Sequence, residues 1–115
     1  MRYFLLFVFA ATGLQADPPQ IVDVMASPSG GTWRFSVTLS HPDTGWDHYA
    51  DGWRVEALDG TVLGTRVLAH PHVNEQPFTR SQSGIAVPDS ATQVLVRGKD
   101  SVDGWSEEAV VFDLP

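Results

Sequence analysis

The stretch WRFSVTLS, residues 33–40, decides the fold of this chain. Its apolar residues Trp33, Phe35, Val37 and Leu39 alternate with residues that are polar or charged. An alternation with a period of two is typical of a β-strand that buries one face and exposes the other. The stretch therefore predicts a strand over 33–40 whose apolar side faces the core.

The same alternation recurs along the rest of the chain between clusters of turn-forming residues. The turn signals are Ser27-Pro28-Ser29-Gly30-Gly31, Asp59-Gly60 and Pro88-Asp89-Ser90, and Ser83-Gly84 predicts an irregularity inside a strand. We expect seven strands, over about 21–26, 33–40, 53–57, 61–69, 78–87, 92–98 and 108–114. The predicted core contains Trp33, Phe35, Val37, Leu39, Trp53, Val55, Val94 and Val96.

Seven short strands in about 100 residues predict an all-β fold, a single antiparallel β-sandwich. Trp53 on the third strand, and the run Val94 to Ser101 on the sixth, resemble fibronectin type III and immunoglobulin-like domains. The resemblance implies a seven-stranded sandwich of that type over 17–115. The segment 41–51 also resembles a motif in small exported bacterial proteins of unassigned function, which implies no established activity.

The first residues resemble a secretory signal peptide over 1–16. Arg2 supplies a minimal positive region, residues 3–14 are apolar but too few to span a bilayer, and Ala16 offers a cleavage site. We therefore expect a periplasmic or secreted protein that begins near Asp17. No cysteine follows, so we expect no lipid anchor and no membrane association after cleavage.

The charge and composition exclude several partners. Removing Arg2 from a chain of net charge −7 leaves −8, which disfavours nucleic acid as a partner. The chain has no cysteine, so thiolate zinc sites and copper sites with a cysteine ligand are excluded. Its stability must come from the apolar core alone.

All four histidines lie in two segments, 41–51 and 70–75, that also carry carboxylates. In an antiparallel fold successive connections alternate between the two ends of the molecule. Both segments, and the predicted loop 99–106, fall at one end, while the turns at 27–31, 59–60 and 88–90 fall at the other. Functional loops on a rigid scaffold are a common arrangement.

This clustering predicts a site for Zn(II) or Cu(II), since imidazoles and carboxylates are common ligands of these ions. His70 and His72 lie two residues apart and flank Pro71, so we expect them to form the nucleus of the site. The alternative is that the histidines only pack the loops and bond to neighbouring acids. The candidate ligands are His41, His48, His70, His72, Asp43, Asp47 and Glu75.

A second hypothesis is an adhesion-type module that binds a protein or glycan partner through its loops. Its candidate residues are Trp46, Tyr49, Asp51 and Trp105, although aromatics at the end of a sandwich also close cores. The segment 100–104 is interpreted as a solvated acidic turn, because calcium loops need more oxygen ligands. No nucleophile elbow or phosphate-binding loop is present, so we expect no catalytic residue and no enzyme.

Overall fold

The structure is a computed structural model that describes residues 17–115, so the predicted signal peptide over 1–16 lies outside the described residues. The described part is all-β, and none of its segments is a helix, let alone one that could cross a membrane. The strands are β2 (Gln20–Ser29), β3 (Thr32–Ser40), β4 (Ala50–Glu56), β5 (Val62–Val67), β6 (Phe78–Ile85), β7 (Gln93–Asp100), β8 (Gly104–Trp105) and β9 (Val110–Asp113).

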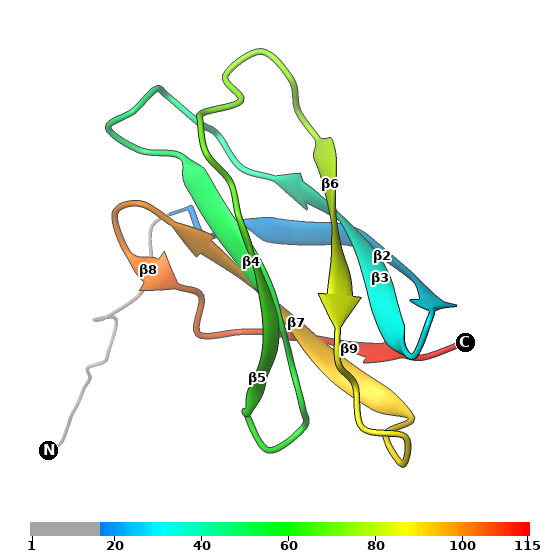
Figure 1. The fold of residues 1–115 in the computed structure, drawn as a ribbon. Coiled ribbons are helices and arrows are strands. Elements are labelled where there is room, and N and C mark those ends of the chain that lie inside the picture. Colours follow the sequence, from blue (N-terminus) through cyan, green and yellow to red (C-terminus); the bar gives the residue numbers. More distant parts are fainter. Residues whose placement is uncertain (1–16) are drawn as a thin grey trace, which may run out of the picture.

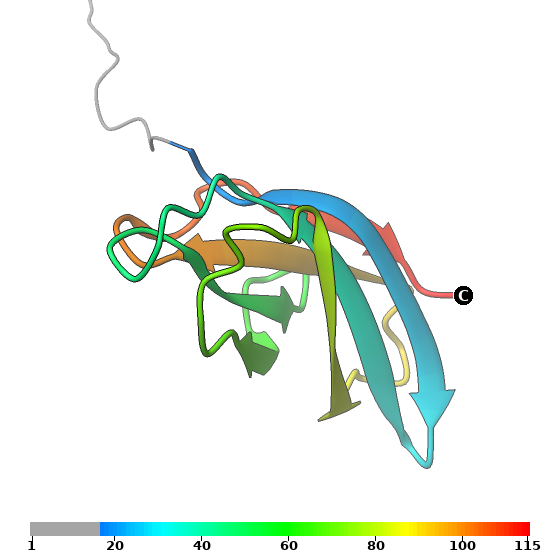
Figure 2. The same ribbon diagram turned by 90° about the horizontal axis from the view of Figure 1, so that it is seen from above.

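The strands form two antiparallel sheets (Figure 1). One sheet has the order β2-β3-β6, and the other has the order β5-β4-β7-β8, with β9 also paired to β7. Seen from above, β2 and β3 curve together as one long hairpin with β6 beside them (Figure 2). Each of the seven predicted strands is present, and the two-residue β8 is an eighth that the sequence analysis did not predict.

The two sheets share one apolar core, as the alternation predicted. Phe35, Val37 and Leu39 of β3 are fully buried. From the other sheet they meet the equally buried Trp53, Val55, Val94 and Val96. Trp33 is only partly buried but packs against the same cluster, so the predicted core is confirmed with one residue at its margin.

Bulges set which residues of the edge strands face inward. The register of β2 against β3 shifts between Ile21 and Asp23, so Ile21, Val24 and Ala26 can all pack on the core although their spacing is not regular. A similar shift lies opposite Trp33 and Phe35, where Gly84 adopts a φ of 74°. This irregularity is the one predicted at Ser83-Gly84.

Several strand boundaries differ from the sequence-based prediction, those of β2, β5 and β7 among them. β2 continues through Ser27, Pro28 and Ser29, which had been assigned to a turn, because an outer strand tolerates a proline. Val62–Val67 is shorter than the predicted 61–69. β7 extends to Asp100, and Gly104–Trp105 pairs back onto it, so the predicted loop 99–106 shrinks to the turn 101–103.

The two ends of the molecule differ as strand parity predicted. Leu39 pairs with Phe78, Gly52 with Val67 and Ala50 with Asp100, so the ends of these strands that carry the histidine segments lie together. We call this the histidine end. The turns at 57–61 and 86–92 lie at the opposite end, the lower end of Figure 1.

Gly64 of β5 is required where the two sheets approach each other. A Cβ atom at this position would lie 2.8 Å from Cγ1 of Ile85, which is buried at the end of β6. Contacts of this kind force side chains and backbone to shift in a packed core.

We therefore expect Gly64→Ala to lower the free energy of unfolding by about 1–3 kcal/mol, measured by urea denaturation. Thr65→Ala is the matched control, because Thr65 is the exposed neighbour on the same strand, and a change within about 0.5 kcal/mol is expected there. Equal effects of the two substitutions would contradict the close approach.

Candidate metal centre

The β3–β4 loop folds back on itself and brings two histidines together. Thr44 N donates to His48 O over 3.0 Å, and His48 N donates to Gly45 O over 3.2 Å. Gly45 has a φ of 141°, a conformation that favours glycine at this tight reversal. As a result the rings of His41 and His48 lie edge to face, 4.9 Å apart between centroids.

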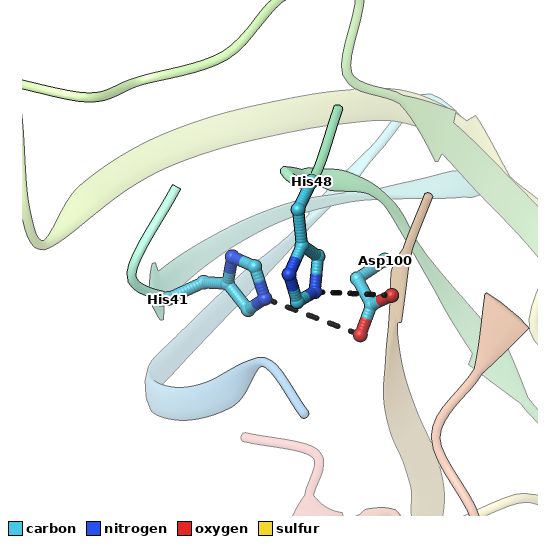
Figure 3. Close-up of side chains that lie close together, drawn as sticks. All are labelled: His41, His48 and Asp100. Carbon is cyan, nitrogen blue, oxygen red and sulfur yellow. Dashed lines mark ion pairs between the residues drawn. The ribbon is translucent and has the colours of Figure 1, made fainter. Parts of the chain in front are cut away.

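Asp100 completes this group from the last position of β7. In this strand Val94, Val96, Gly98 and Asp100 all face inward, so the alternation that builds the core also points a carboxylate at the histidines. His41 Nε2 lies 4.0 Å from Asp100 Oδ2, and His48 Nε2 lies 3.6 Å from Asp100 Oδ1 (Figure 3). The side chains of His41 and Asp100 are fully buried, and that of His48 is 22% exposed.

The three side chains have polar atoms without hydrogen-bond partners, and these atoms face one another. His41 Nε2, His48 Nε2 and Asp100 Oδ2 are buried and have no hydrogen-bond partner. Asp100 Oδ1 already accepts from Val102 N and Asp103 N, at 2.8 and 2.7 Å, which fixes the carboxylate at the head of the turn. Buried polar atoms are normally satisfied, so three unsatisfied ones facing each other call for an explanation.

Asp43 orients His41 through the ring nitrogen that does not face the group. Its Oδ1 lies 2.5 Å from His41 Nδ1 and also accepts from Ala50 N, while its Oδ2 accepts from His72 N over 2.8 Å. A carboxylate bonded to Nδ1 holds the proton there and leaves Nε2 as the ligand atom. Asp43, predicted as a ligand, thus contacts the candidate ligand His41 on the side away from His48 and Asp100.

The geometry suits a small dication. One ligand atom from each of His41, His48 and Asp100 can be chosen so that all three lie within 4.8 Å of one another. The ligand atoms of a tetrahedral zinc ion are about 3.4 Å apart, so side-chain shifts of about 1 Å would close the site. Among residues 17–115, no other group of three or more potential metal ligands lies this close together.

The second histidine segment is arranged differently from the predicted nucleus of the site. His70 and His72 do lie together, with ring centroids 4.6 Å apart. However, His72 is buried in a stack on Phe78, its Nε2 lies 3.0 Å from Arg80 Nη2, and no third potential ligand among residues 17–115 joins the pair. Glu75 is exposed and pairs with Arg80 over 3.2 Å. Asp47 is exposed in the β3–β4 loop.

Asp100 is the residue that the sequence analysis missed. The segment 100–104 had been interpreted as a solvated turn, whereas Asp100 is fully buried. The signal was present in the sequence, because the inward alternation of Val94 and Val96 continues through Gly98 to Asp100 when the strand is extended by one step.

The four predicted partner-binding residues divide into two groups. Trp46 is 68% exposed and contacts Tyr49 edge to face, with centroids 5.6 Å apart. Asp51 pairs with Lys99 over 2.9 Å, and Trp105 lies beneath the guanidinium of Arg54. Tyr49, Asp51 and Trp105 line one cavity of about 340 Å³, which Trp46 does not line.

One curated protein is similar in sequence to most of this chain. Over 94 residues the chain is 49% identical to a protein of Halomicrobium mukohataei named "Putative lipoprotein". The alignment covers 81% of this chain and 46% of that protein, so the chain spans about half the length of its relative. No family model matches the chain, and no solved structure matches it. The immunoglobulin-like topology accordingly stays a prediction.

The surroundings of His72 favour its neutral form. Burial against Phe78 lowers the pKa of this imidazole, and the nearby Arg80 and His70 lower it further, against a smaller opposing effect of Glu75 and Asp43. Nε2 accepts from Arg80, so protonation would place a second cation directly against the guanidinium. In the unfolded chain the imidazole takes up its proton near pH 6.5.

We therefore expect stability to fall as the pH drops below about 6.5, since the unfolded state then binds more protons at His72 than the folded state. His72→Gln should unfold more easily at neutral pH but lose less stability between pH 7.5 and 5. Urea unfolding in EDTA measures how the free energy of unfolding of each protein changes with pH. The other three histidines are present in both proteins, so their contribution cancels in the difference. Identical slopes would show that His72 titrates normally in the fold.

Proposed function

We propose that this chain is an exported binding module for Zn(II) or Cu(II), built on an immunoglobulin-like sandwich and without catalytic activity. The observation that supports the proposal best is the buried convergence of three unsatisfied atoms, His41 Nε2, His48 Nε2 and Asp100 Oδ2. Export is supported by the predicted signal peptide and by the name of the relative.

Electrostatics favour a cation at this centre. The carboxylates of Asp43 and Asp100 are both fully buried, and no lysine or arginine within residues 17–115 pairs with either of them. Burying two anions is costly unless positive charge compensates them. A dication bound to two neutral imidazoles and Asp100 would supply that charge and would satisfy all three orphaned atoms together.

The donor set fits these metals and leaves room for an additional ligand. Two imidazole nitrogens and one carboxylate oxygen are the ligand types of zinc and of Cu(II). Three protein ligands would leave a fourth tetrahedral position for a further ligand, and His48 is the one partly exposed member of the group. Protons compete for the imidazole nitrogens, so acid weakens the binding of metal.

Titration calorimetry on the protein without a histidine tag tests this proposal. We expect one Zn(II) or Cu(II) per chain with micromolar or tighter affinity, and a stabilisation of about 2.7 kcal/mol at a free metal concentration 100 times the Kd. His48→Gln and Asp100→Asn each remove a ligand, so each should weaken binding by more than about 100-fold, beyond the 10- to 100-fold expected for the supporting Asp43→Asn.

His70→Gln is the matched control, since it removes an exposed imidazole from the other segment and should leave the affinity unchanged. Loss of binding in His70→Gln with retention in His48→Gln would move the site to the His70/His72 pair. The absence of binding by the intact protein would leave the histidines with a packing role. Circular dichroism and melting of each variant establish that it folds.

A further inference from the structure

A groove crosses the outer face of the larger sheet at the histidine end, over a strand position that has no side chain. Gly52 of β4 forms its floor, between Val67 of β5 on one side and Lys99 of β7 on the other. A Cβ atom at Gly52 would lie 3.3 Å from Arg66 O and within 3.9 Å of the Lys99 side chain. A side chain at position 52 would therefore narrow the groove.

The walls of the groove combine aromatic rings with a paired acid and base. Tyr49 and Trp105 line it, and Arg54 lies 4.0 Å from the centroid of the Trp105 ring, which fixes that ring on the sheet. Asp51 Oδ2 and Lys99 Nζ are 2.9 Å apart and remain 18% and 32% exposed. The volume of about 340 Å³ is enough for one small ring and lies at the lower end of ligand sites.

These features define the chemistry of the occupant. Asp51 and Lys99 neutralise each other. The third charged residue of the lining, Arg66, directs its guanidinium to Ser81 O over 2.7 Å, so the groove favours a neutral ligand over an ion. A carboxylate accepts hydrogen bonds and an ammonium donates them, so an adjacent pair matches two neighbouring hydroxyl groups, each of which can do both. Aromatic side chains add apolar surface with a polar tip. A pyranose ring has such neighbouring hydroxyls and an apolar C–H face.

We propose that this groove binds a single neutral pyranose unit of a glycan, with Asp51 and Lys99 bonded to adjacent hydroxyls and Trp105 and Tyr49 against the ring. The groove is separate from the metal centre. Lys99 lines it on the outer face of β7, whereas the next residue, Asp100, points inward to the histidines. Binding of the sugar is therefore expected in metal-free protein as well.

Saturation-transfer NMR and calorimetry on EDTA-treated protein test the proposal. The probes are the methyl glycosides of glucose, galactose, mannose and N-acetylglucosamine, with cyclohexanol as a ring of similar size that lacks neighbouring hydroxyls. We expect millimolar binding of at least one glycoside and no comparable binding of cyclohexanol. Equal binding of cyclohexanol, or binding of none of the sugars, would overturn the proposal.

Substitutions locate the bound sugar. Gly52→Ala fills the floor and should weaken binding at least about tenfold, and Asp51→Asn, which keeps the shape, about fivefold or more through loss of a charge-assisted bond. Asp89→Asn, an exposed acid at the opposite end, is the matched control and should bind normally. If Trp46→Ala abolishes binding while Gly52→Ala and Asp51→Asn retain it, the sugar lies on the exposed loop and the groove is not the site.

Discussion

The histidine end depends on one buried carboxylate, that of Asp43. Its two oxygens accept from His41 Nδ1, Ala50 N and His72 N, and so tie the start of β4 and the β5–β6 loop to the end of β3. Each of these donors would be a buried, unsatisfied group without it. The same contacts that close the end of the molecule also direct His41 Nε2 inward, so packing and the candidate metal centre share one cause.

How far the sequence could predict this arrangement depends on the range of the interactions involved. The alternation of residues 33–40 determines β3 and its buried face locally, and parity then brings both histidine segments to one end. Which imidazoles point inward is decided by contacts between segments. The ring of His72 is held by Phe78 and Arg80, which belong to β6, and no spacing within 70–75 contains that information.

Asp100 shows a second reason why the sequence alone could not predict the candidate site. Its type and position are those of a turn residue, and Asp103 and Gly104 beside it favour the same interpretation. Pairing with Ala50 on β4 extends β7 by two residues beyond the predicted end and moves the carboxylate from solvent to the interior. A strand boundary shifted by two residues therefore separates a solvated acid from a candidate ligand, and only the partner strand fixes that boundary.

Because side chains alternate along β7, its last two residues, Lys99 and Asp100, lie on opposite faces of the sheet. Asp100 faces the interior beside His41 and His48, and Lys99 faces solvent, where it is neutralised by Asp51. The two faces are held by the same link between loops, because Tyr49 N donates to Ser101 Oγ and Ser101 N donates to Tyr49 O. Tyr49 follows His48 in the chain, and Ser101 follows Asp100. The hydrogen bonds that position the candidate ligands His48 and Asp100 therefore also hold the wall of the outer groove.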